Sequence, residues 1–250
     1  MNGSLPQLRI AVVLGIAGTI AAALVFPYVL GVRPDLLATA RISRGVLVAI
    51  GSLQTGVACF LLGWAGLKLG ATLGLGAPWL AALVYARERP TTSNWFSAVV
   101  LGAVAACVIL AAVALFGAPI ANSTAVHEPA AWKGLLASPY GGIVEETELR
   151  VFAMGSLAWL IARMTGGAPR AWLMVIAIMT TSVLFGVGHL PLAAQFAPMT
   201  ASIVARVIVY NAIGGLVFGW LYWKCGLEHA MLAHFCADLV LHAVAPLMMA

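Results

Sequence analysis

The sequence predicts an all-α protein, a polytopic transmembrane helical bundle with about seven to eight spans. Of the 250 residues, 63% are hydrophobic and only 8% are charged, against about 25% charged residues in a soluble globular domain. The apolar runs reach about 20 residues, the length that a helix needs to cross the hydrocarbon core of a bilayer. Only helices or closed barrels satisfy their backbone in lipid, and these runs are unlike the alternating strands of about ten residues that barrels use.

The predicted spans follow the apolar runs along the chain. They cover residues 9–32, 45–68, 94–118, 137–163, 171–190, 198–223 and 227–248. The first run exceeds the core of a signal peptide in length, so we expect it to remain as an anchor helix, although "TIAAALVF" leaves cleavage open. The segment 75–90 is too short to span upright, and we expect it to lie in the interface or to complete a partial eighth crossing.

The basic residues are predicted to set the topology of the chain, and no nucleic-acid partner is expected. The formal net charge is +5, but Lys and Arg stand singly at the ends of apolar runs. With seven spans, the loops on the N-terminal side carry seven basic residues and the loops on the other side carry four. This excess favours a cytoplasmic N-terminus. An eighth span would move the loops that follow it to the other side of the membrane, and the count would no longer hold.

Ionisable residues concentrate in the C-terminal half. The first three predicted spans hold almost none, whereas the later four hold Glu145, Glu146, Glu148, Arg150, His189, Arg206, His234, Asp238 and His242. A charge in hydrocarbon costs several kcal/mol, so an ionisable residue in a span is by default a functional hypothesis. The sequence therefore predicts an enclosed polar site in this half.

Helix spacing assigns partners within "GGIVEETELRVF", residues 141–152. Glu146 and Arg150 stand at i,i+4, where an ion pair is easily formed and where a buried Arg150 needs one. Glu145 is turned about 100° away on an α-helix and is the better candidate for a working carboxylate. Glu148 has two possible roles, and the sequence leaves both open. It faces a water-filled cavity or a loop, or it is a structural residue.

Two further segments carry candidate residues. In "FGVGHLP", Phe185 and His189 stand at i,i+4 among glycines that permit close approach of helices or substrate. In "HAMLAHFCAD", His234 and Asp238 project from one face of the last predicted helix. His229 is expected near the membrane boundary with Glu228, and His242 is expected to be a packing histidine.

These motifs carry a resemblance to a known family. "EETELR" fits E-E-x-x-x-R, "FGVGH" fits F-x-x-x-H, and "HFCAD" fits H-x-x-x-[N/D]. In this order and spacing they resemble the CAAX-protease and bacteriocin-processing family of glutamic-type intramembrane endopeptidases, which includes the type II CAAX prenyl proteases. With the blocks "VLFGVGHL" and "GGLVFGWLYWKCG", the resemblance covers roughly residues 137–240.

The resemblance implies an intramembrane endopeptidase that hydrolyses a peptide bond near the membrane. Glu145 and His189 would hold and activate the attacking water, and His234 and Asp238 would stabilise the oxyanion. Peptide hydrolysis needs such a base and such donors. An ionised Asp238, where the prenyl proteases typically carry Asn, accepts hydrogen bonds but cannot donate one.

The resemblance also implies supporting roles for further residues and a domain organisation of the chain. Glu146, Arg150 and Phe185 would shape the site, and neither a cofactor nor a metal ion would be required. Two other departures from the family are Val151, which follows Arg150 where Gly is usual, and the acidic Glu148. Residues 131–250 are expected to be the catalytic helical core, and residues 1–130 to be accessory transmembrane helices of one integrated membrane domain.

Two other functions remain open at this point. A zinc-dependent membrane protease would use Glu145, His189 and His234 as three ligands with an open position, although the sequence contains no H-E-x-x-H. Its four cysteines show no C-x-x-C spacing and are expected to be buried thiols. A non-proteolytic transporter, channel, immunity or scaffold protein would keep a polar cavity without hydrolysis. Substitution of Glu145 by Gln separates the classes, because a scaffold tolerates it and a protease does not.

The expected partners are a peptide or protein substrate, with a lipidated or transmembrane C-terminus among the possibilities, and membrane lipid. The short loops and the Ala/Gly-rich composition favour a bacterial inner (plasma) membrane.

Overall fold

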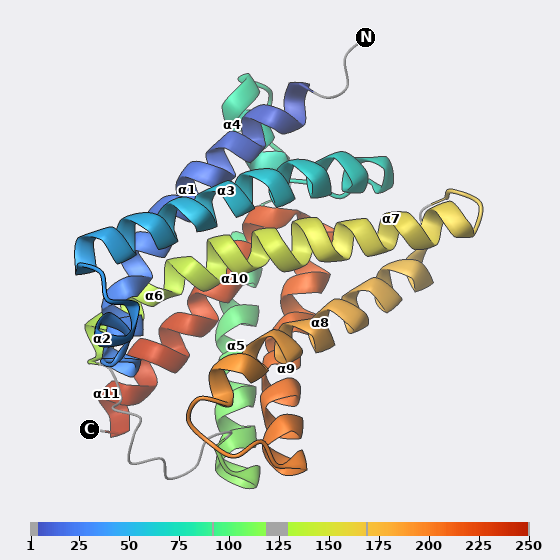
Figure 1. The fold of residues 1–250 in the computed structure, drawn as a ribbon. Helices are drawn as coiled ribbons and strands as arrows, with labels where there is room; N and C mark the ends of the chain where they lie inside the picture. Colours follow the sequence, from blue (N-terminus) through green and yellow to red (C-terminus); the bar gives the residue numbers. More distant parts are fainter. Residues whose placement is uncertain (1–4, 92, 119–129, 169, 250) are drawn as a thin grey trace.

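The computed structural model describes residues 5–91, 93–118, 130–168 and 170–249, and this part of the chain is helical without any strand (Figure 1). A 3-10 turn at Ala71–Leu73 follows α3, and π-helical segments η2, η3 and η4 cover Tyr140–Glu145, Thr147–Met154 and Val240–Val244. The α-helices are α1 Leu5–Val32, α2 Leu36–Ala40, α3 Arg44–Gly70, α4 Pro78–Tyr85, α5 Trp95–Phe116, α6 Ala131–Pro139, α7 Gly155–Met164, α8 Ala171–Ala193, α9 Ala201–Cys225, α10 Leu227–Leu239 and α11 Ala245–Met249.

The helical membrane bundle predicted from the sequence is confirmed. Six helical stretches of the described chain are long and apolar enough to cross a membrane: Gln7–Val32, Arg44–Leu73, Trp95–Phe116, Ala171–Ala193, Ala201–Cys225 and Leu227–Met248. They correspond to six of the seven predicted spans. Within 75–90, the helix α4 has eight residues, which agrees with the expectation that this segment is too short to span upright.

The remaining predicted span, 137–163, lies within one uninterrupted helical stretch, residues 131–164, which we term the charged rod. Figure 1 shows this rod as a single long element from α6 to α7, crossing the other helices. Its middle is π-helical over η2 and η3. Four ionisable residues, Glu145, Glu146, Glu148 and Arg150, lie in this middle part. Short π-helical segments frequently occur at functional sites.

The N-terminal helices pack against the charged rod through small residues. Those that α3 buries recur every three or four positions: Ser52, Gly56, Cys59, Gly63, Gly66 and Gly70. At Gly66, an added Cβ would collide with the backbone carbonyl of Val151 in the rod. Small residues let helix backbones approach this closely in membranes. The glycine spacing of α3 therefore explains how α1 and α3 come to lie against the rod.

Glycines also fix the helices that bring the other candidate residues to the rod. Gly186 of α8 lies against the backbone of Ile208 in α9, and Gly102 of α5 lies against the backbone of Ala233 in α10. Figure 1 shows α5 and α9 side by side. The second contact lies directly beside His234 in sequence, so α10 is held against α5 at this position.

Candidate active site

A buried ion pair lies in the middle of the charged rod. Glu146 and Arg150 are fully buried, and the Arg150 Nε atom lies 3.3 Å from Glu146 Oε2. This confirms the pair expected from their i,i+4 spacing. The Arg150 guanidinium also lies 5.6 Å from the centroid of the Phe185 ring, a distance at which a cation is attracted to an aromatic face.

His234 is the centre of the site. Its Nδ1 atom lies 2.8 Å from Glu146 Oε1, within hydrogen-bond distance. Its Nε2 atom lies 3.5 Å from Glu145 Oε2 and 3.6 Å from Asp238 Oδ1. One imidazole thus connects the buried ion pair on one side with two further carboxyl groups on the other. The predicted proximity of His234 and Asp238 is confirmed.

The orientation of the His234 ring is set by two phenylalanines. Phe218 of α9 stacks on it, with ring centroids 4.4 Å apart and an interplanar angle of 17°, and Phe185 meets it edge-on at 5.5 Å. Sequence reasoning selected Phe185 and missed Phe218. The phenylalanine lies in an apolar helix with no polar neighbour to mark it, and only the packing of α9 against α10 reveals its role.

His189 lies beside the same Phe185 ring. Its Nδ1 atom is 2.8 Å from the Phe185 carbonyl oxygen, and the two rings meet edge-on at 4.8 Å. In the described part of the chain, no carboxylate oxygen lies within 4 Å of a His189 nitrogen, so His189 and Glu145 are not in direct contact. A water molecule can bridge polar groups at such a separation.

Gly141 provides room for the carboxyl groups. A Cβ at this position would collide with Asp238 Oδ2 and would lie 2.9 Å from His234 Nε2. The rod can therefore approach α10 only because residue 141 has no side chain. The sequence analysis quoted this glycine without assigning it a role, since the contact partner lies almost a hundred residues away.

The other ionisable residues of this half lie outside the central cluster. Arg206 donates to the Ala118 carbonyl (2.9 Å) and to the Ser202 hydroxyl (2.8 Å), and so ties α9 to the end of α5. His242 packs edge-on against Tyr28 of α1, with its Nδ1 atom 3.3 Å from the Tyr28 hydroxyl, which agrees with a packing role. Glu148 is half-buried on the rod.

His229 has a packing role as well. It is buried in the first turn of α10, and its ring stacks on Trp95 with centroids 4.2 Å apart. Of the four cysteines, all free, Cys59 is buried as expected, but Cys107 is exposed on the apolar surface of α5. That expectation was wrong for Cys107, because hydropathy does not distinguish a lipid-facing position from one inside the bundle.

The described residues contain no group of three or more His, Cys, Asp and Glu side chains that could hold a metal ion. The three zinc ligands considered from the sequence, Glu145, His189 and His234, do not form such a group. His234 Nε2 lies 3.5 Å from Glu145 Oε2, but no carboxylate oxygen of the described chain lies within 4 Å of a His189 nitrogen.

A family model described as type II CAAX prenyl endopeptidase Rce1-like matches residues 127–240. Over these residues the chain is similar to the type II CAAX prenyl endopeptidases. The matched residues include the charged rod, α8, α9 and all of α10, and so every residue of the cluster around His234. Neither the comparison with curated proteins nor that with solved structures found a match.

The family match indicates a CAAX-type protease, and the six candidate spans support an integral membrane protein. Tyr28, His242 and the glycine-rich face of α3 lie outside the matched residues. The family match therefore covers the site, but it does not cover the helices α1 and α3 that pack on the rod.

Proposed function

We propose that this CAAX-family protease is a glutamic endopeptidase in which Glu145 and His189 activate water and His234 and Asp238 stabilise the oxyanion. The observation that carries the proposal is the environment of His234 Nε2. This atom faces two carboxyl groups, on Glu145 and Asp238, which keep 24% and 16% of their side-chain area exposed. The fully buried Glu146 holds the opposite nitrogen.

Water activation is supported by the hydrogen bond of His189. If its Nδ1–H donates to the Phe185 carbonyl, the neutral ring carries its lone pair on Nε2. That nitrogen can accept a proton from water. An ionised Glu145 also only accepts hydrogen bonds, so a water between the two groups would meet two acceptors. One acceptor removes the proton and the other orients the water for attack.

Oxyanion stabilisation is supported by the position of His234. When both ring nitrogens are protonated, Nδ1–H donates to Glu146 and Nε2–H becomes a donor on the side of Glu145 and Asp238. A neutral Asp238 carboxylic acid adds a second donor there. Fixed donors in a site with little water stabilise a developing oxyanion strongly.

The ion pair would act as a positioning element. Arg150 contacts Glu146, and Glu146 contacts His234, so the three side chains form a series of contacts that ends at His234 Nε2. Phe185 and Phe218 hold the ring plane of His234. Catalytic groups that are oriented in this way by a third group recur in hydrolases.

The proposed substrate is a peptide or protein whose scissile bond lies near the membrane surface. The family description favours a CAAX-type C-terminus carrying a lipid, and a sorting helix or a secreted peptide would reach the same site. A bacterial inner membrane remains our proposed location.

The test is cleavage of a peptide library by the purified protein, with products mapped by mass spectrometry. Glu145→Gln is the matched variant, because it is nearly isosteric and removes the acceptor that activates water. We expect a loss of about 100-fold or more, while the variant inserts and purifies as one species. Full activity of Glu145→Gln would end the glutamic assignment.

A further inference from the structure

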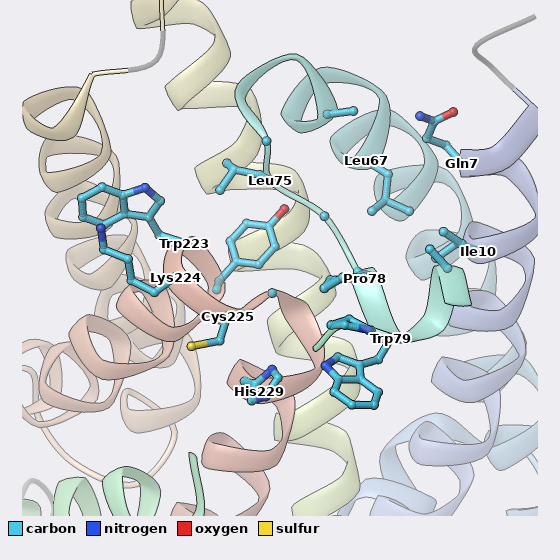
Figure 2. Close-up of a pocket in the computed structure, with 18 of the residues that line it drawn as sticks. Gln7, Ile10, Leu67, Leu75, Pro78, Trp79, Trp223, Lys224, Cys225 and His229 are labelled. Atoms are coloured by element: carbon cyan, nitrogen blue, oxygen red, sulfur yellow. The ribbon is translucent and has the colours of Figure 1, made fainter. Parts of the chain in front are cut away.

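A cavity of about 500 Å³ lies at one end of the bundle, apart from the candidate active site. Its wall comes from the start of α1, the end of α3, the connection to α4 and the junction of α9 with α10. Figure 2 shows Trp79 and His229 close together on this wall, with Trp223 and Lys224 to one side and Gln7 and Ile10 to the other. Four candidate spans begin or end at these residues, so the cavity lies at the level of the membrane surface.

The cavity is positively charged. Arg87 and Lys224 line it, and no Asp or Glu is among its lining residues. Within the described part of the chain, neither cation has a carboxylate oxygen within 4 Å: Arg87 lies 5.4 Å from the centroid of the Tyr85 ring, and Lys224 Nζ lies 3.5 Å from that of Trp223. A third cation, Arg9, lies 5.8 Å from the same Tyr85 ring.

The acidic residue next to the cavity is engaged elsewhere. Glu228 follows the lining residue Gly226 closely in sequence, but its Oε1 atom accepts a hydrogen bond of 2.7 Å from the Leu80 backbone N–H. This contact caps the first turn of α4, where a carboxylate is favourable. Glu228 therefore stabilises α4 and forms no ion pair within 4 Å with Arg87 or Lys224, although it lines the neighbouring cavity together with Arg87.

The wall also contains hydrogen-bond donors without acceptors. The Tyr222 hydroxyl and the Trp79 Nε1 atom are buried and have no hydrogen-bond partner among the residues that the structure describes. Tyr222 itself is only 1% exposed. A buried donor without a partner is unfavourable, and an acceptor oxygen in the cavity would relieve this after a small side-chain movement. Cations together with unpaired donors indicate an anionic ligand rich in oxygen.

A second cavity of about 540 Å³ adjoins the first and shares Trp79 and Arg87 with it. Leu80 and Leu83 of α4 line it, together with the charged residues Arg87, Arg89 and Glu228. Leu83 is 77% exposed, on a helix at the membrane surface. An amphipathic ligand could thus place its charged group in the first cavity and its apolar part along α4.

We propose that the first cavity binds the phosphate group of an anionic phospholipid, with Arg87 and Lys224 as its cationic partners. Basic pockets at the ends of transmembrane helices suit anionic headgroups, and Trp and Tyr side chains are typical of this depth. The leucine side chains of the neighbouring cavity, Leu80 and Leu83, favour a lipid over a free phosphate compound, since the latter has no apolar part to bury.

The test is native mass spectrometry of the purified full chain in detergent, titrated with phosphatidylglycerol or with phosphatidylcholine. We expect phosphatidylglycerol to bind more tightly. The double substitution Arg87→Gln with Lys224→Gln should weaken that binding by about ten-fold or more. Arg163→Gln with Arg170→Gln is the matched control, because it removes two exposed cations that lie outside the cavity on the same predicted side of the membrane. The control should bind as the unmodified chain does.

Several outcomes would overturn the proposal. One is equal affinity of the unmodified chain for the two lipids, and another is equal affinity of the Arg87/Lys224 variant and the unmodified chain for phosphatidylglycerol. An equal loss in the Arg163/Arg170 control would show general attraction to a basic surface instead of a site. Displacement of phosphatidylglycerol by soluble glycerol phosphate at equal concentration would identify a free phosphate compound as the ligand. Both substituted pairs are exposed, so a thermal melt should show folded protein throughout.

Discussion

The three carboxyl groups around His234 differ in exposure, and this difference separates their proposed roles. Glu146 is fully buried between Arg150 and His234, where Arg150 matches its charge and its Oε1 atom lies 2.8 Å from His234 Nδ1. Glu145 and Asp238 are partly exposed on the Nε2 side of the ring. A group that reacts with water or substrate must be accessible, whereas a group that positions another is best kept in a dry environment.

The first prediction at this scale concerns Asp238. We expect Asp238→Asn to keep most of the activity and Asp238→Ala to lose about 100-fold or more, the usual scale for an oxyanion donor. The reason is that a neutral carboxylic acid and an amide each donate one hydrogen bond from this position, 3.6 Å from His234 Nε2. The measurement is kcat/KM against pH, in which the unmodified protein should lose activity as the pH rises while the Asn variant stays flatter. An Asn variant as inactive as the Ala variant would mean that Asp238 works as an anion.

A second prediction concerns the buried ion pair. Arg150→Ala and Glu146→Gln should lower the free energy of unfolding by about 3 to 5 kcal/mol, because each leaves an unpaired buried group. The measurement is the thermal stability in detergent. Arg163→Ala is the control, since Arg163 is exposed on the same rod and should melt as the unmodified protein does. If Arg150→Ala melts normally yet is inactive, the pair serves catalysis directly.

At the scale of helices, the sequence predicted where the helices lie along the chain better than it predicted their backbone geometry. Hydropathy located six spans that the structure contains, and i,i+4 spacing predicted the Glu146–Arg150 and His234–Asp238 contacts. The π-helical turns of η2, η3 and η4 were not predicted. Composition carries little information about them, because a π-helix uses the same residues as an α-helix and depends on the packing of its neighbours.

The prediction at this scale concerns the contact between α3 and the charged rod. Gly66→Ala should destabilise the protein by about 1 to 3 kcal/mol, the usual cost of overpacking, because the new Cβ would meet the backbone carbonyl of Val151. The control is Gly45→Ala in the first turn of the same helix, where a Cβ meets nothing within 4 Å. Thermal melts compare the two variants. Equal stability would show that α3 does not press on the rod in solution.

At the scale of the whole molecule, the residues of the candidate site could be predicted because each motif is local in sequence. The surfaces that form between distant segments of the chain could not be predicted from the sequence. Glu145, His189, His234 and Asp238 were each visible as polar residues in apolar runs. Gly141 and Phe218, by contrast, acquire their roles only from packing against α10. The cavity beside Trp79 likewise joins parts of the chain more than 140 residues apart. The accessory status of residues 1–130 stays a prediction.

A last prediction concerns the metal requirement of the intact protein. Activity should survive exhaustive treatment with EDTA and phenanthroline, and metal analysis should find no stoichiometric zinc. The physical reason is the arrangement of ligands: zinc in a protease needs three convergent donors and an open position. Here the described residues contain no group of three or more His, Cys, Asp and Glu side chains that could hold a metal ion, and none of their carboxylate oxygens lies within 4 Å of a His189 nitrogen. Glu145→Gln gives the comparison, since it should be inactive with or without added metal. Loss of activity on chelation, with rescue by zinc and not by magnesium, would replace the glutamic mechanism by a zinc-dependent one.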